Sequence, residues 1–368
     1  MVFTTPVLHY EAVEYANNRS EPQWVPKTLT LAKSKNCNSS EEYGAGDHQI
    51  LVRVQAASLN PMDSMLYNSY YRVIGYLKGK SGIGVDYSGT VVSIGASAAK
   101  KTNFTEGDEI CGMYVHPFSS GAVAEYLLID PRKDPAVTRK PKSLDLTTAA
   151  AWPLVYGTAH QLIEAARVKK GDKVLIIGGA TAVGRMAIQI MTRYYETSKI
   201  VATCSGNSAP SVKKLGAEDT IDYTSHASLR EPVEKEAASA KFDVIFDCVG
   251  NSDLFGTMDK ILRRNGYFLT ICGDKKQTYK SVSVAWEVGV QTFAVARIVL
   301  CYVGYYKYKY RIFMATPASW IHDGARRLDE GMEVTVDSIY AKGEFGKAFS
   351  RLRSNKASGK ILVKCQED

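Results

Sequence analysis

The segment Val174–Ile190 constrains the fold of this chain more than any other part of the sequence. It joins a continuous apolar run, Val174–Ile177, through a glycine-rich turn to a stretch with apolar residues at helical spacing. A short uninterrupted apolar strand is typical of a parallel sheet that is buried on both faces. The segment therefore predicts a strand–turn–helix unit whose backbone N–H groups, at the start of the helix, face an anion.

The predicted secondary structure changes character twice along the chain. Residues 48–60, 82–95 and 104–130 read as short strands separated by glycine turns, so the first 150 residues are expected to be mainly β. From about 158 to 273, strand-like and helix-like stretches alternate, which predicts a doubly wound parallel sheet. The last stretch, 334–365, returns to strand, helix and strand.

Composition limits the protein classes that this chain can belong to. Its 368 residues favour about two domains and a core that needs no crosslinks. The net charge of +8 is spread without a long basic block, so nucleic acid is not expected as a partner. Seven widely spaced cysteines without a CxxC pair argue against a disulfide framework and a structural zinc site. Reduced thiols and an acidic, signal-free N-terminus predict a cytoplasmic protein.

The glycine turn is a degraded dinucleotide-binding motif. Against G-x-G-x-x-G, Gly179 and Gly184 match, whereas Thr181 stands where the second glycine is usual, followed by Ala182 and Val183. That glycine normally permits close approach of a pyrophosphate, so Thr181 puts cofactor affinity in doubt. A plain α/β turn is the alternative interpretation.

The end of the second strand of the α/β region bears on which cofactor would bind. NAD-binding folds usually carry Asp or Glu there, whereas this chain has Ser205, Asn207 and Ser208, followed by Lys213 and Lys214. Hydroxyls and cations without a carboxylate favour a 2′-phosphate, and hence NADPH over NADH. The alternative is that the two lysines only solvate a helix face.

Eight segments, in order along nearly the whole chain, resemble the medium-chain dehydrogenase/reductases. They are Val54–Asp63, Gly84–Gly89, Gly107–Asp108, Gly121–Tyr126, Ala149–Ala159, Leu215–Tyr223, Phe242–Gly250 and Ser358–Lys360. Within that superfamily the chain resembles the zinc-free, zeta-crystallin-like quinone oxidoreductases, and among these the fungal Yim-type proteins, some of which are associated with lipid droplets. The resemblance implies an α/β fold made of a GroES-like β-rich catalytic domain and a doubly wound Rossmann domain.

The resemblance also bears on domains and zinc. We expect the catalytic domain to comprise residues 1–157 and 320–368, the Rossmann domain 158–319, and the active site to lie between them. The zinc enzymes of the superfamily carry Cys and a His-Glu pair in the first two motifs, where this chain has Asn60, Asp63 and Asp86. With no set of three ligands, no metal is expected.

Hydride transfer from NADPH to a quinone or an α,β-unsaturated carbonyl is the reaction that remains. By match to the family motif, Asn60 and Asp63 are expected to orient substrate and nicotinamide, and Tyr71 is a candidate donor to the developing oxyanion. Asp63 has a second interpretation as a turn cap, and Tyr71 as a tyrosine at the solvent edge.

The resemblance further implies which residues line the cofactor channel. These are Thr158, Ser205, Tyr223, Val249 and Gly250. Tyr223 has an alternative interpretation as a core tyrosine at the end of a strand.

Residues 288–313 combine an apolar stretch, interrupted by Arg297, with alternating Tyr and Lys. This pattern suits an interfacial anchor at a membrane or lipid-droplet surface. The alternatives are a helix that covers the sheet or the strand at which this family forms homodimers. A rival function follows: a catalytically weak or inactive member that senses nucleotide or acts as a scaffold at a lipid surface.

Overall fold

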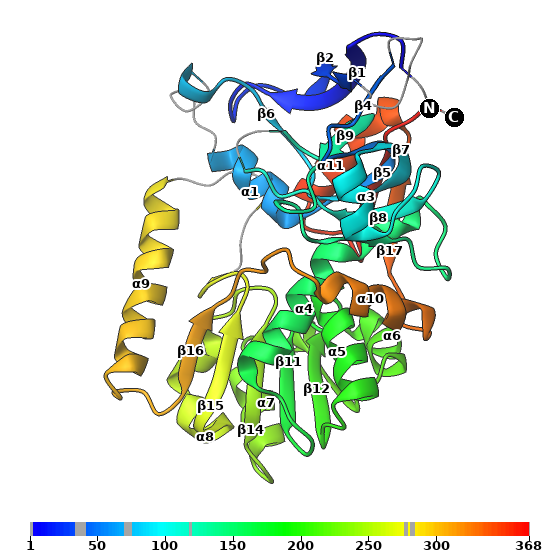
Figure 1. Ribbon diagram of the computed structural model, residues 1–368. Helices are drawn as coiled ribbons and strands as arrows, with labels where there is room; N and C mark the ends of the chain where they lie inside the picture. The colour runs from blue at the N-terminus through cyan, green and yellow to red at the C-terminus, as the bar shows by residue number, and fades with distance from the viewer. Residues whose placement is uncertain are drawn as a thin grey trace. The chain divides into compact units, whose positions relative to one another are not determined.

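The computed structural model of the protein describes residues 3–33, 42–69, 76–117, 120–275, 279 and 284–367, without the side chains of 284–292 (Figure 1). The chain divides into two compact units. Unit 1 comprises Met1–Leu154, Tyr279–Ser281 and Pro317–Asp368, and unit 2 comprises Val155–Thr278 and Val282–Thr316. The sequence placed these boundaries at 157/158 and 319/320.

Unit 1 is built from mostly antiparallel sheets, in which Val336–Tyr340 and Lys360–Lys364 pair in parallel. The largest has the strand order β10-β8-β7-β5-β18-β17, with β9 also pairing with β5. Its strands are β5 (Ile50–Leu59), β7 (Asp86–Ile94), β8 (Glu109–Met113), β9 (Tyr126–Ile129), β10 (Val137–Arg139), β17 (Val336–Tyr340) and β18 (Lys360–Lys364). A second sheet, β2-β1-β6, contains β1 (Val7–Tyr15), β2 (Gln23–Thr30) and β6 (Ser81–Gly82), and a third pairs β3 (Ala32–Lys33) with β4 (Tyr43–Gly44).

The C-terminal segment completes the first unit. Strand β18 pairs antiparallel with β5, so that Ile361 lies opposite Leu59 and Val363 opposite Ala57. These strands are buried because one shared core lies against them. The core of unit 1 therefore combines the first 150 residues with the C-terminal segment, whose strand β18 lies beside β5.

Unit 2 contains six parallel strands in the order β13-β12-β11-β14-β15-β16. They are β11 (Lys173–Ile177), β12 (Lys199–Cys204), β13 (Asp219–Asp222), β14 (Phe242–Asp247), β15 (Leu262–Thr270) and β16 (Lys309–Ile312). All five residues of β11 are buried, as its apolar run predicts. The order reverses at β11, and a Rossmann fold binds its ligand at such a switch point.

Helices connect these strands. Unit 1 holds α1 (Pro61–Ser69), α3 (Ala96–Thr102), α10 (Trp320–Asp329) and α11 (Phe345–Arg353), and α4 (Pro153–Ala166) runs across the boundary into unit 2. Unit 2 holds α5 (Ala182–Tyr194), α6 (Ala209–Lys214), α7 (Arg230–Ala237), α8 (Met258–Ile261) and α9 (Val284–Tyr302). Short 3₁₀ turns are η1 (Thr148–Ala151), η2 (Gly206–Ser208), η3 (Tyr223–Ser225), η4 (Asp253–Gly256) and η5 (Lys342–Glu344).

Helix α9 and strand β16 together form the segment that the sequence singled out. Arg297, the charge that interrupts its apolar stretch, lies with Nε 3.3 Å and Nη2 3.2 Å from Asp274 Oδ2. Its guanidinium carbon lies 3.5 Å from the ring centroid of Phe255. The Tyr310 hydroxyl donates to the other carboxylate oxygen of Asp274 at 2.5 Å. Arg297 is therefore paired on the inner side of the helix, and it fastens α9 to the sheet.

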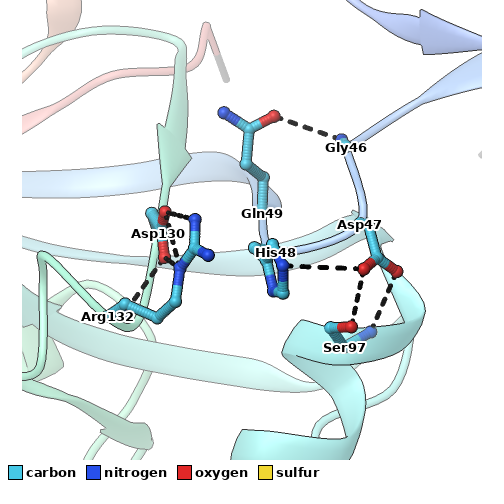
Figure 2. Close-up of polar contacts among 7 residues, drawn as sticks. All are labelled: Gly46, Asp47, His48, Gln49, Ser97, Asp130 and Arg132. Atoms are coloured by element: carbon cyan, nitrogen blue, oxygen red, sulfur yellow. Dashed lines mark hydrogen bonds and ion pairs between the residues drawn. The ribbon is translucent and has the colours of Figure 1, made fainter.

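An exposed polar group in unit 1 shows how the protein satisfies surface charges locally (Figure 2). Asp47 accepts hydrogen bonds from the backbone N–H of Ser97 at 3.2 Å and from its hydroxyl at 2.6 Å, at the start of α3. Nearby, Arg132 donates to both carboxylate oxygens of Asp130, at 2.9 and 2.6 Å. These contacts fix turns, and the pairs are complete without a ligand.

Candidate functional site

The glycine turn after β11 has the backbone geometry that the sequence pattern predicts. Gly178 has a φ of +87°, and its N–H donates to the Thr203 hydroxyl of β12 at 3.0 Å. Thr181 is the N-cap of α5: its hydroxyl accepts the Gly184 N–H at 3.0 Å. That hydroxyl also donates to the Gly178 carbonyl at 2.7 Å. Thr181 therefore closes the turn and stabilises the helix start, a role that the usual glycine could not fill.

Three glycines of the turn have no space for a side chain. A Cβ on Gly184 would lie 2.4 Å from the Gly178 carbonyl oxygen, and a Cβ on Gly178 would lie 2.5 Å from the Val249 side chain. Gly179 is equally confined, since its Cβ would lie 2.6 Å from the Cβ of Ala202. The turn is therefore a close-packed cradle of backbone at the start of α5, whose first residues are Ala182 and Val183.

The loop after β14 reaches the same edge of the sheet. The carboxylate of Asp247 accepts the backbone N–H groups of Val249, Gly250 and Asn251, at 3.1, 2.9 and 2.9 Å. Burial raises the pKa of Asp247 to about 6, against the lowering effect of these three donors. Asp247 thereby fixes the conformation of Val249 and Gly250 beside the glycine turn.

The loop after β12 carries the predicted hydroxyls. The Ser205 and Ser208 hydroxyl oxygens are 3.0 Å apart, and Asn207 between them is exposed. Tyr223 follows β13 and is half exposed. Thr158 is buried on α4. Apart from Thr158, the predicted cofactor residues follow the carboxyl ends of β11, β12, β13 and β14, which is one edge of the parallel sheet.

In unit 1, a buried polar network surrounds Asp86. Its Oδ2 accepts hydrogen bonds from the Ser58 hydroxyl at 2.8 Å, the Asn60 amide at 2.9 Å and the Lys360 ammonium at 2.9 Å. Its Oδ1 accepts the Leu154 N–H at 2.8 Å. Lys360 also donates to the Asn60 amide oxygen. Every member of this network has a partner inside the unit, and Asp86 and Lys360 form a buried ion pair.

Asn60 and Asp63 meet at the start of α1. Asp63 Oδ2 accepts the Asn60 N–H at 2.7 Å, and Oδ1 accepts the Gly84 N–H at 2.9 Å. Burial raises the pKa of Asp63 to about 6. Asp63 thus caps the turn and connects α1 to the segment before β7, and its role toward substrate stays a prediction. The third predicted residue, Tyr71, lies outside the described residues.

Two cysteine thiols, possible metal-ligand clusters and a cavity are further candidates for a functional site. Burial raises the pKa of the Cys248 thiol, and that of Cys272 to about 12, so both are protonated and weakly nucleophilic at neutral pH. Among the described residues, no three His, Cys, Asp or Glu side chains gather as a metal ion requires. A cavity of about 220 Å³ in unit 1 is lined by Tyr10, Tyr114 and other residues, none of them a predicted site residue.

Comparisons with known proteins agree with this geometry. The profile of the alcohol dehydrogenase GroES-like domain matches residues 46–141, and that of the zinc-binding dehydrogenases matches 182–306. The chain is 33% identical to Protein YIM1-1 of Lachancea thermotolerans, over 96% of this chain and 97% of that protein. It is 31% identical to Protein YIM1 of Saccharomyces cerevisiae, over 96% and 97%.

The chain belongs to the medium-chain dehydrogenase/reductase superfamily. Solved structures of similar fold include a quinone oxidoreductase from Coxiella burnetii, with a TM-score of 0.72 and 24% identity over 97% of this chain and 99% of that one. Another is the human synaptic vesicle membrane protein VAT-1 homolog-like protein, with a TM-score of 0.66 and 18% identity over 98% and 99%. These confirm the predicted α/β fold, with a GroES-like and a Rossmann-like part.

Members of this superfamily of oxidoreductases use a nicotinamide cofactor, and the residues of unit 2 fit one. The tight glycine turn begins α5, whose N-terminus would attract the charge of a phosphate group. Ser205 and Ser208 would lie toward the adenosine ribose.

Some residues of these sites were not singled out as site residues from the sequence. Lys360 lies between a Ser-Gly pair and the apolar run of β18, and a lysine at the start of a buried strand was a readable signal. Arg185 directly follows Gly184 among the mainly apolar residues of the predicted helix, and this was the second signal. Thr203 carried no sequence signal. Its hydroxyl accepts the Gly178 N–H only because the pairing of β11 with β12 places Thr203 opposite Ile177.

Proposed function

We propose that this protein is a zinc-independent oxidoreductase that transfers hydride from NADPH to a quinone or an α,β-unsaturated carbonyl compound. The observation that carries the proposal is the edge of the unit 2 sheet. There the glycine cradle adjoins a β12 loop that presents serine hydroxyls where NAD-binding folds place a carboxylate. When bound, the cofactor supplies the hydride, and the reduced substrate anion then takes a proton.

The buried network of unit 1 supports a reaction without zinc. Asn60, Asp63 and Asp86 stand at the positions of the zinc-ligand motifs, and each is engaged by donors or acceptors of the protein itself. An ammonium, that of Lys360, supplies the local positive charge. Asn60 directs its amide hydrogens at Asp86 and at the Ser58 carbonyl, so we assign it a positioning role. Tyr71 remains our candidate proton donor to the substrate oxygen.

Direct titration tests this function. Binding of NADPH and NADH to the purified chain is followed by nucleotide fluorescence, and NADPH oxidation is then assayed with panels of quinones and enones. We expect NADPH to bind more tightly than NADH and to be consumed with at least one panel. No binding of either nucleotide at millimolar concentration would overturn the proposal. Binding without turnover would favour the nucleotide-sensing role.

A second candidate function is a scaffold at a lipid surface, and the outer face of α9 favours it. Its side chains there are apolar and strongly exposed: Phe293 (69%), Val295 (54%), Val299 (52%) and Tyr302 (92%). The single charge of this stretch, Arg297, is paired on the inner side. No helix in the described ranges has the length and apolarity to cross a bilayer.

The residues that follow α9 add positive charge beside this apolar face. Lys307, Lys309 and Arg311 are exposed, and Tyr305 is 70% exposed between them and the helix. Cations and aromatic side chains beside an apolar surface suit the interface of an anionic membrane or lipid droplet. A helix lying on the lipid surface, rather than through it, is the arrangement that we propose.

Vesicle flotation tests the second function. The triple variant Lys307→Glu/Lys309→Glu/Arg311→Glu is compared with a control that reverses Lys100, Lys101 and Lys133, exposed cations of unit 1. We expect the wild type and the control to float with anionic vesicles, and the triple variant to stay in the soluble fraction. Unchanged flotation, or no flotation of the wild type, would overturn it. A concentration-dependent dimer without flotation would assign the face to a second copy.

A further inference from the structure

Among the residues that the structure describes, buried cations are paired with carboxylates, with one exception. Four lysine and arginine residues are buried in the described chain. Three of them form ion pairs: Lys173 with Glu236 at 3.0 Å, Lys342 with Glu125 at 2.7 Å, and Lys360 with Asp86 at 2.9 Å. The fourth, Arg185 on α5, has no carboxylate within 4.0 Å among the described residues.

The contacts of Arg185 are all with neutral groups. Its Nε donates to the Ala180 carbonyl at 3.1 Å, and its Nη2 donates to the Ser211 hydroxyl at 3.0 Å. Burial lowers the pKa of this guanidinium. A buried charge without a counter-charge is costly, and proteins rarely keep one without a reason. Arg185 therefore lacks an anion that its three counterparts have.

The position of Arg185 indicates which anion. Ala180 belongs to the glycine turn, and Ser211 lies in the first turn of α6, after β12, so the guanidinium bridges these two segments. The Ser211 hydroxyl in turn donates to the Ser208 carbonyl at 2.8 Å. In a Rossmann fold, the space between the first turn and the end of the second strand receives the adenosine ribose. The anion that distinguishes one nicotinamide cofactor from the other is the 2′-phosphate on that ribose.

The carboxylate of Asp222 lies beside this loop, against Gly206. Asp222, at the end of β13, accepts the Thr224 N–H at 2.9 Å, the Thr224 hydroxyl at 2.6 Å and the Ser225 hydroxyl at 3.2 Å. These donors lower the pKa of Asp222. Asp222 also contacts Gly206 of the β12 loop, so its carboxylate has donors from both segments, whereas the contacts of Arg185 are with Ala180 and Ser211.

We propose that Arg185 is the residue that selects NADPH, by supplying the counter-charge for the 2′-phosphate, with the Ser205 and Ser208 hydroxyls as further donors. The inference rests on the proposed function, in that it assumes that a nicotinamide dinucleotide binds at this edge. In this proposal Arg185, rather than the exposed Lys213 and Lys214, is the main source of the preference for NADPH over NADH. The charge-assisted hydrogen bonds of a guanidinium to phosphate are strong and directional.

Calorimetric titration separates this role from a structural one. Wild type and Arg185→Gln are titrated with adenosine 2′,5′-bisphosphate and with 5′-AMP, which differ only in the 2′-phosphate. We expect the variant to bind the bisphosphate at least about tenfold more weakly, and 5′-AMP within about twofold of wild type. Arg185→Lys keeps the charge and should recover part of the loss. Lys213→Gln is the matched control and should change neither affinity.

Four outcomes would overturn the inference, and they point to different errors. Equal weakening of both ligands, together with a lower melting temperature, would make Arg185 a brace between the turn and α6. Unchanged bisphosphate affinity in Arg185→Gln would exclude the residue while leaving the proposed function intact. If inorganic phosphate bound as tightly as the bisphosphate, the ligand of the Arg185 guanidinium would be a free anion rather than a nucleotide phosphate. Wild type that binds neither nucleotide would remove the proposed function as well.

Discussion

The buried polar network of unit 1 and the glycine turn of unit 2 differ in how completely their polar groups are paired. Around Asp86, each carboxylate oxygen and the Lys360 ammonium are matched within the protein. Around the glycine turn, Arg185 keeps a buried charge with neutral partners only. A region that satisfies itself is built for stability and placement, whereas a region left incomplete is built for a ligand.

The largest expected effect comes from breaking the complete network. Lys360→Met would leave the Asp86 carboxylate buried without its cation, and we expect it to lower the free energy of unfolding by about 3–5 kcal/mol. Urea denaturation measures it, and Lys364→Met, on the same strand, is the control. Adding Asp86→Leu to Lys360→Met should restore part of the stability, since the unpaired charge is removed. A Lys360→Met protein as stable as wild type would show that the network contributes little.

The pH dependence of stability sharpens the comparison within unit 1. The pKa of Asp63 is raised from 3.8 to about 6, so the folded chain binds this proton more tightly than the unfolded chain does. The contribution of Asp63 to stability is therefore greatest below pH 4 and is lost as the pH rises through 6. The whole loss is about 2–3 kcal/mol.

Asp63→Asn removes this titration. As the pH rises from 4 to 6, we expect wild type to lose stability relative to Asp63→Asn. Above pH 6 the difference in unfolding free energy between the two proteins should stay constant. Denaturant midpoints at a series of pH values give the difference. Asp247, whose pKa is also raised to about 6, titrates in both proteins and cancels. A pH-independent difference would contradict the raised pKa.

A smaller effect is expected at the glycine turn. Thr181→Ala removes the N-cap of α5 and should lower the free energy of unfolding by about 1 kcal/mol, because the Gly184 N–H loses its acceptor. Thr181→Ser keeps the hydroxyl and should be close to wild type. If both variants were equally destabilised, the threonine methyl group rather than the cap would be the stabilising element.

Several elements could be predicted because their signals are local. The apolar run Val174–Ile177, the glycines that follow it and the helical spacing beyond them give a buried strand, a tight turn and α5. Within the alternating region, the pattern of Leu254–Arg264 predicts a helix, but α8 ends at Ile261 and strand β15 begins at Leu262. Its pairing with β14, from Phe242 opposite Leu262, overrides the helical pattern of those residues.

Other features depend on residues far apart in the sequence. The Lys360 ammonium and the Asp86 carboxylate are separated by 274 positions, and no spacing rule connects them. The inward direction of Arg297 depends on Asp274 and Phe255, so the sequence alone left its apolar stretch open to several interpretations. The sequence favours NADPH through the missing carboxylate, the serine hydroxyls and two lysines, whereas the burial of Arg185 and its contact with Ser211 depend on the tertiary structure.

By itself, the sequence determined the family, the alternation of strands and helices, and the position of the glycine turn. These features depend on residues close together in the sequence, because apolar periodicity and glycine positions predict strands, helices and turns from local sterics and burial. Tertiary structure alone decided which charges are paired and which is left over. The reason is physical: the free energy of a buried charge depends on every group within a few ångströms, and folding brings those groups together from distant parts of the chain.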